Sequence, residues 1–127
     1  MSNSAVPAIR CLIAMILLGA GGSTIAQTPP RLFDASPDIY KVVAEDGKYR
    51  IIEANYKPGQ RSNFFSSPGW LFYYVTDCHI RKHYPDGRVL DGGLSFAGFA
   101  FQAVGVDSAA LENVGSNACR IVMFEPK

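Results

Sequence analysis

The sequence has little excess charge, few histidines and no apolar run long enough to span a membrane. Each shortage excludes a class of protein. Its 127 residues carry a formal net charge of +1, whereas a nucleic-acid-binding domain usually presents a strongly basic face. Only two histidines are available as imidazole ligands, and a membrane-spanning helix needs about 20 consecutive apolar residues. We therefore expect no nucleic-acid partner and no membrane span in the mature chain.

The composition is that of a single folded domain. Hydrophobic residues make up 48% of the chain and charged residues 18%. A disordered chain has the opposite balance, with few apolar residues and a high net charge. The length is sufficient for one domain with a buried core.

The N-terminus has the pattern of a secretory signal peptide. Arg10 is its one charged residue, and the ten residues 11–20 are all apolar or small. Thr24 and Ala26 place small residues at the −3 and −1 positions of a cleavage site. The alternative, a membrane anchor, would need a longer apolar run. We predict that residues 1–26 are removed, so that the protein is exported to the periplasm or secreted.

The remainder of the chain alternates between short runs of β-branched or aromatic residues and turn signals. An irregular arm is predicted over 27–38, and turns at Asp46-Gly47, Pro58-Gly59 and Pro85-Asp86-Gly87. No segment sustains the 3.6-residue repeat of an amphipathic helix. About eight short strands at regular spacing predict an all-β sandwich or closed barrel. The predicted strands are 40–43, 48–57, 71–76, 79–84, 88–90, 96–104, 109–114 and 118–125.

Several short motifs also follow one another in a characteristic order. Tyr40-Lys41-Val42-Val43 precedes a strand that ends in Lys57-Pro58-Gly59, and a loop then ends at Pro68. An aromatic strand leads on to Tyr84-Pro85-Asp86-Gly87, and Glu112-Asn113-Val114-Gly115 comes before the final apolar strand. This order resembles that of the small single-domain cupins.

The resemblance covers residues 39–125. It implies an all-β fold, the double-stranded β-helix or cupin jelly-roll barrel, over 39–127 after the signal peptide and the arm. It also implies a frequent property of the family, association into homodimers through strand exchange or sheet packing.

The cupin family holds a divalent metal with inward-facing side chains, and this sequence departs from that pattern. In the family, two histidines separated by one residue follow the Pro-Gly pair, a further ligand lies on the next strand, and a last histidine precedes the closing asparagine. The resemblance places these positions at Phe65 and Ser67, at Leu71 or Phe72, and at Ala109. Their side chains are poor or impossible ligands for such ions. The resemblance therefore implies a degenerate, metal-free cupin without a cofactor.

The two histidines, His79 and His83, fall in one predicted strand. Four residues along a strand span roughly 13 Å, whereas a metal–imidazole bond is about 2.1 Å long, so one ion cannot bind both rings. We expect a solvated basic strand face that also carries Arg81, Lys82 and Arg88. The functional alternative is a ribbon that binds anions or contacts another subunit.

Cys78 and Cys119 are the cysteines that remain after cleavage of the signal peptide. Paired cysteines of exported proteins tend to form disulfides, but a disulfide requires Cα atoms within roughly 4.4 to 6.8 Å of each other. The sequence leaves both a disulfide and two buried free thiols open. A catalytic thiol would need a histidine base, and His79 projects to the opposite face of the strand from Cys78.

The side chains at the degenerate metal-site positions allow two interpretations of the interior, a filled core or a pocket. The bulk of phenylalanine favours a filled core, because small barrels fill with side chains. The alternative is an apolar pocket for a small hydrophobic or aromatic molecule. The segment 63–70 is interpreted as a rim loop or a strand corner. The pocket and rim candidates are Phe65, Ser67, Trp70, Leu71 or Phe72, Tyr73, Tyr74, Phe99, Phe101 and Ala109.

Three functions follow from these interpretations. The first is an exported, non-catalytic protein that binds a small apolar or aromatic molecule. The second is a structural or interaction protein that acts as a dimer. The third, a metal-independent enzyme, ranks last because it needs an inward-facing histidine base. The carboxylates Glu53, Asp77 and Asp91 have no evident partner, and we expect them to be solvated.

Overall fold

The structure is a computed structural model that describes residues 21–23, 25 and 27–127. The predicted signal peptide lies almost entirely outside the described residues, so its cleavage stays a prediction. Within the described residues, no helix is both long enough and apolar enough to cross a membrane.

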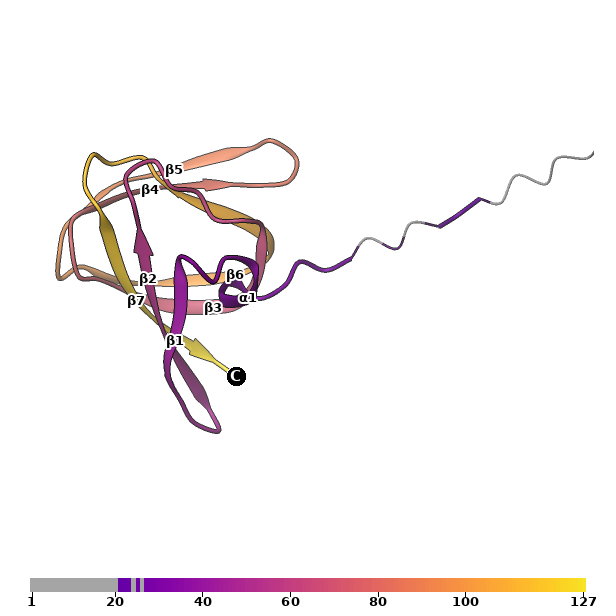
Figure 1. Ribbon diagram of the computed structural model, residues 1–127, viewed down its shortest axis with the longest axis horizontal. Helices are drawn as coiled ribbons and strands as arrows, with labels where there is room; N and C mark the ends of the chain where they lie inside the picture. Colours follow the sequence, from indigo (N-terminus) through magenta and orange to yellow (C-terminus); the bar gives the residue numbers. More distant parts are fainter. Residues whose placement is uncertain (1–20, 24, 26) are drawn as a thin grey trace, which may run out of the picture.

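The described chain folds into one antiparallel sheet of seven strands, preceded by one helical turn (Figure 1). The strand order in the sheet is β1-β2-β7-β3-β6-β4-β5. The elements are α1 (Leu32–Ala35), β1 (Tyr40–Glu45), β2 (Tyr49–Tyr56), β3 (Phe65–Tyr74), β4 (Cys78–His83), β5 (Val89–Ser95), β6 (Ala100–Asn113) and β7 (Cys119–Pro126).

The long strand β6 folds the sheet over on itself. Its first part pairs with β3, from Tyr73 opposite Ala100 to Phe65 opposite Ala109. Its last four residues, 110–113, pair with β4 instead. Figure 1 shows β3 and β6 in the lower part of the molecule, β4 and β5 in the upper part, and β6 curving from one to the other. The two parts of the sheet therefore face each other across the interior.

Every second residue along parts of β2 and β7 is buried, and these side chains form one side of the core. Ile52, Ala54 and Tyr56 are buried on one face of β2, because alternate residues of a strand share a face. On β7 the buried apolar residues are Ile121 and Met123. Ile52 lies opposite Met123, which in turn lies opposite Phe72 of β3. These rows of side chains form a continuous apolar layer across three strands.

The segment 63–70, interpreted as a rim loop or a strand corner, lies mostly within strand β3. The strand begins at Phe65 and runs through Pro68 and Gly69. A Pro-Gly pair usually indicates a break, but here Gly69 adopts a φ of +116°, which an L side chain rarely tolerates. The buried positions change from odd to even numbers at this glycine, so that Phe65 and Phe72 both face the interior.

The C-terminal half also differs from the prediction. Residues 96–104 and 109–114 were expected to form two strands, yet β6 is continuous from Ala100 to Asn113. Phe96 and Phe99 instead form a tight turn, in which the Phe99 amide donates to the Phe96 carbonyl at 3.1 Å. The described chain therefore has seven strands, rather than about eight.

The N-terminal arm is more ordered than predicted. It contains the helical turn α1, whose Leu32 is fully buried. Before α1, the Pro30 carbonyl accepts a hydrogen bond of 2.9 Å from the amide of Ser66 on β3. Arg31 forms an ion pair with Glu125 of β7. These contacts fasten the arm to one end of the folded sheet.

A disulfide joins the starts of β4 and β7. Cys78 and Cys119 are bonded, with their Cα atoms 5.1 Å apart. Both are almost fully buried. The bond links the part of the sheet formed by β4 and β5 directly to the part formed by β7 and β3.

Candidate functional site

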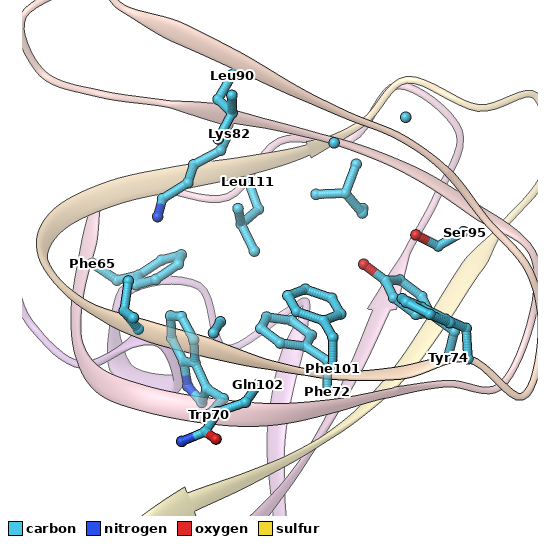
Figure 2. Close-up of a pocket in the computed structure, with 16 residues that line it drawn as sticks. Phe65, Trp70, Phe72, Tyr74, Lys82, Leu90, Ser95, Phe101, Gln102 and Leu111 are labelled. Atoms are coloured by element: carbon cyan, nitrogen blue, oxygen red, sulfur yellow. The ribbon is translucent and has the colours of Figure 1, made fainter.

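An apolar cavity of about 600 Å³ lies between the two facing parts of the sheet and is open to solvent beside exposed residues such as Leu90 and Val104. Figure 2 shows its lining, with aromatic side chains below and aliphatic side chains and Lys82 above. The floor comes from β3, from the start of β6 and from Phe99. The roof comes from β4, β5 and the end of β6. The lining residues are Phe65, Trp70, Phe72, Tyr74, Ile80, Lys82, Leu90, Gly92, Gly93, Ser95, Phe99, Phe101, Gln102, Ala103, Val104 and Leu111.

The floor is a connected aromatic surface. The rings of Phe72 and Phe101 stack with centroids 5.0 Å apart and an interplanar angle of 4°. Trp70 meets Phe72 edge to face at 5.4 Å, and Phe65 meets Trp70 at 5.7 Å. Such aromatic pairs contribute more to stability than the burial of their apolar surface alone. The floor therefore presents rigid ring faces and edges to anything in the cavity.

The cavity has few polar groups. Lys82 and the pair formed by Tyr74 and Ser95 lie at opposite ends of the view in Figure 2, and Gln102 and the indole of Trp70 lie at the floor. The ammonium of Lys82 extends from the roof towards Phe65. At the other end, the hydroxyl of Tyr74 lies beside Ser95. Burial raises the pKa of the Tyr74 hydroxyl, while its hydrogen bond with Ser95 acts in the opposite direction. Tyr74 is therefore a neutral hydrogen-bonding group at physiological pH.

Solved structures share this arrangement of strands. A cupin domain from Bordetella pertussis Tohama I superposes with a TM-score of 0.62 at 15% sequence identity, over 80% of this chain and 98% of that one. The chain has the cupin fold. An uncharacterised Klebsiella pneumoniae protein with a double-stranded β-helix domain superposes with a TM-score of 0.54 at 19% identity, over 69% and 75% of the two chains.

A third structure is more distant in sequence. A cupin superfamily protein from Desulfitobacterium hafniense gives a TM-score of 0.50 at 9% identity, over 69% of this chain and 75% of that one. No protein-family profile and no curated protein matches the sequence. The cupin fold predicted from the order of motifs is thus confirmed at the level of the fold.

The residues at the cupin metal positions do not form a metal site. Phe65 and Phe72 line the cavity, and neither has a lone pair to donate to a cation. None of the lining residues is a histidine, cysteine, aspartate or glutamate. Throughout the described residues, no group of three or more such side chains is placed to hold a metal ion. The residues present therefore do not fit the divalent metal that the cupin fold implies.

Six of the residues proposed from the sequence come together around the cavity. They include the alternative Phe72, whereas Leu71 faces the other side of the sheet and is 46% exposed. Because strand residues alternate between faces, the change of face at Gly69 decides between these two neighbours. The six residues are Phe65, Trp70, Phe72, Tyr74, Phe99 and Phe101.

The other proposed residues lie away from the cavity. Tyr73 is 45% exposed on the outer face, beside Leu71. Ser67 is buried, and its hydroxyl accepts a hydrogen bond of 3.1 Å from the amide of Gly69. Ala109 is buried opposite Phe65 in the β3–β6 pair. Of these four residues, none lines the cavity.

The roof was not foreseen from the sequence. Ile80, Lys82, Leu90, Ser95 and Leu111 line the cavity from β4, β5 and the end of β6. Alternation within residues 79–84 would have placed Ile80 and Lys82 on one face. Nothing in the local sequence indicates that this face lies over the aromatic floor, because that depends on how β6 curves between the two parts of the sheet.

The histidines lie on β4, and the expectation of a simple basic face was wrong. His79 pairs with Asp91 of β5, which also accepts from Arg81 at 3.3 Å. His83 lies 3.2 Å from a carboxylate oxygen of Glu112 on β6, and its side chain is largely buried. Each histidine therefore faces a carboxylate on a neighbouring strand.

The carboxylates that were expected to be solvated also have partners. Glu53 accepts a hydrogen bond of 3.0 Å from Arg120 of β7. Asp77 accepts from the amide of Ala97 at 2.8 Å. Together with Asp91, these side chains connect neighbouring strands and turns. The sequence did not reveal these partners, because strand register brings each partner close to its carboxylate although the two are distant in the sequence.

Proposed function

We propose that this protein is an exported, non-catalytic cupin-fold protein that binds a small apolar or aromatic molecule in its interior cavity without a metal. The observation that carries the proposal is the aromatic-floored cavity of about 600 Å³. This volume lies within the roughly 300–1,000 Å³ range of sites for small molecules, which are also mostly apolar with a few polar groups.

Two further observations support this proposal. The cavity has no imidazole, carboxylate or thiol in its lining, which leaves neither a metal ligand nor a histidine base for catalysis. The Cys78–Cys119 disulfide and the apolar N-terminal run are both typical of an exported chain.

The binding function is tested with the neutral fluorescent probe N-phenylnaphthylamine. We expect its fluorescence to rise when it enters the cavity of the wild-type protein. The variant Leu90→Trp should weaken binding by about tenfold or more, because the larger ring occupies the space that the ligand needs. Leu90 is 57% exposed as well as lining the cavity, so its replacement leaves the buried core intact.

The matched control is Leu94→Trp. Leu94 lies on the same strand and is 59% exposed, but it does not line the cavity. Equal loss of binding in both variants would show that the probe sits elsewhere on the protein. Absence of binding to the wild-type protein would overturn the proposed function.

A second candidate function is that of an interaction protein that pairs with a second copy of itself. The outer face of the sheet carries the exposed side chains of Tyr49, Leu71, Tyr73 and Phe124. Leu71 and Phe124 lie directly opposite each other in the β3–β7 pair. A contiguous exposed apolar patch is unusual on a monomer.

A second copy is the favoured occupant because the groove that crosses this face has an uncharged lining. The groove has a volume of about 780 Å³, and none of the residues that line it is charged. Two such faces can therefore pack together without burying an unpaired charge. Analytical ultracentrifugation should detect a dimer that Leu71→Lys dissociates and that Leu94→Lys leaves intact. A wild-type monomer at all concentrations would contradict this candidate.

A further inference from the structure

We propose that the cavity selects apolar or aromatic molecules that carry an anionic group, and that the ammonium of Lys82 binds this group. The inference rests on the proposed binding function, and it names the class of ligand. It depends on where Lys82 lies, on which charges surround it and on what lies at the other end of the cavity.

Lys82 is held on the inner face of the roof by strand pairing. It lies opposite Leu111 of β6 on one side and opposite Leu90 of β5 on the other. Both leucines line the same cavity. Figure 2 shows the Lys82 side chain extending between the roof and Phe65, with its nitrogen on the cavity side. The charge is therefore presented at the edge of an apolar space.

No carboxylate neutralises this charge. In the part of the chain that the structure describes, Lys82 takes part in no ion pair, although its neighbours do. Asp91 and Glu112 are engaged by Arg81 and the two histidines. The Lys82 nitrogen lies over the ring of Tyr84, 5.1 Å from its centroid.

Two acidic side chains lie near Lys82 without pairing with it. Asp86 and Asp107 line a surface hollow that Lys82 also borders. Asp86 instead accepts a hydrogen bond of 2.6 Å from Arg88. An ammonium on an apolar surface, with an aromatic ring as its main neighbour, retains its capacity to bind an anion.

The opposite end of the cavity is neutral. Tyr74 and Ser95 provide hydroxyl groups there, and the aromatic floor lies between the two ends. A molecule with one anionic end and an apolar body fits this arrangement in a single direction, with the anion at Lys82. A neutral apolar molecule makes the same floor contacts but leaves the ammonium without a partner.

Two fluorescent probes with the same aromatic body test this preference. Anilinonaphthalene sulfonate is N-phenylnaphthylamine with an added sulfonate. We expect the sulfonate to increase affinity for the wild-type protein by about tenfold, because a hydrogen bond between two charged groups is stronger than one between neutral groups. Lys82→Gln should abolish this difference, and Lys82→Arg should retain it.

Lys41→Gln is the control for a general loss of positive charge. Lys41 is an exposed residue of the outer strand β1 and does not line the cavity. Circular dichroism and the melting temperature of each variant show whether it is folded, and Lys82→Arg keeps the test valid if Lys82→Gln is unstable.

The outcomes separate the two proposals. If both probes bind the wild-type protein equally, or if Lys82→Gln weakens both to the same extent, the anionic preference is wrong while the binding function stands. If neither probe binds, the proposed function fails, and this inference fails with it. If Leu90→Trp does not weaken binding of the sulfonate probe, that probe sits outside the cavity, and the inference is likewise overturned.

Discussion

At the scale of single residues, Glu125 is a charged group that lies fully buried in the described chain. Its carboxylate pairs with Arg31 of the arm and with Arg50 of β2, the latter at 3.0 Å. The guanidinium of Arg50 also stacks over the ring of Phe33, 4.6 Å from its centroid. The carboxylate therefore connects the arm to two strands of the sheet.

The substitution Glu125→Gln tests this connection. Breaking a fully buried ion pair costs about 3–5 kcal/mol. Because Arg31 and Arg50 are partly exposed, we expect a smaller loss of about 2–3 kcal/mol in the free energy of unfolding, measured with urea. Glu45→Gln, which removes an exposed partner of Arg50, should change stability much less. A loss equal to that of the control would contradict this role.

A second residue, Asp91, makes stability depend on pH. The hydrogen bond from the Gly93 amide, with His79 and Arg81, lowers the pKa of the Asp91 carboxyl from 3.8 to about 2. A lowered pKa contributes stability that is present above the unfolded value and is lost as the pH falls through the folded value. The melting temperature of Asp91→Asn should therefore lie below that of the wild type at neutral pH.

This difference in melting temperature should shrink as the pH falls from 3.8 to about 2. Thermal unfolding followed by circular dichroism over this range measures it. Identical melting temperatures of the two proteins at neutral pH would show that the bonds of Asp91 to β4 do not stabilise the β4–β5 hairpin.

Among the elements, the crossing of β3 and β6 sets the shape of the cavity floor. A Cβ atom on Gly105 would lie 2.9 Å from backbone atoms of Ser67 and Pro68. One on Gly69 would lie 3.0 Å from the Ala103 carbonyl oxygen. The two backbones approach closely here because neither glycine has a side chain.

The variant Gly105→Ala should therefore force the two strands apart. We expect a loss of about 1–3 kcal/mol in the free energy of unfolding, the usual range for overpacking. Gly47→Ala is the matched control, because a Cβ at Gly47 meets no heavy atom within 4 Å. Its effect should stay within about 0.5 kcal/mol. Equal effects of the two variants would contradict the close approach of β3 and β6.

The strands and turns also show how much of the secondary structure local sequence patterns predict. The predicted strand 48–57 corresponds to β2, and the Pro85-Asp86-Gly87 turn between β4 and β5 was predicted correctly. The continuation of β3 through Pro68 and Gly69 was missed. A Pro-Gly pair is normally a break, and here it continues as strand because β6 provides pairing partners from a distant part of the chain.

In the whole molecule, the Cys78–Cys119 disulfide joins the two facing parts of the sheet. The bonded residues are 41 positions apart. A cross-link over a loop of that length stabilises a protein by about 3–4 kcal/mol, chiefly by restricting the unfolded chain. The bond therefore helps to keep the roof of the cavity over its floor.

Reduction should lower the free energy of unfolding by about this amount, about 3–4 kcal/mol. Urea unfolding with and without dithiothreitol measures it. The double variant Cys78→Ser, Cys119→Ser should be insensitive to the reductant and resemble the reduced wild type. A wild-type protein whose stability is unchanged by complete reduction would contradict this contribution.

The sequence by itself determined the strand-rich composition, most turns and the apolar character of residues 65–74. These depend on local preferences and alternation, which neighbouring residues carry. Only the tertiary structure decided that Phe72 and not Leu71 faces inward, that Lys82 lies above Phe65, and that the interior contains a cavity. Each of these depends on pairing between distant strands and on the curve of β6. Pairing partners are set by the free energy of the whole sheet, so no single segment specifies them.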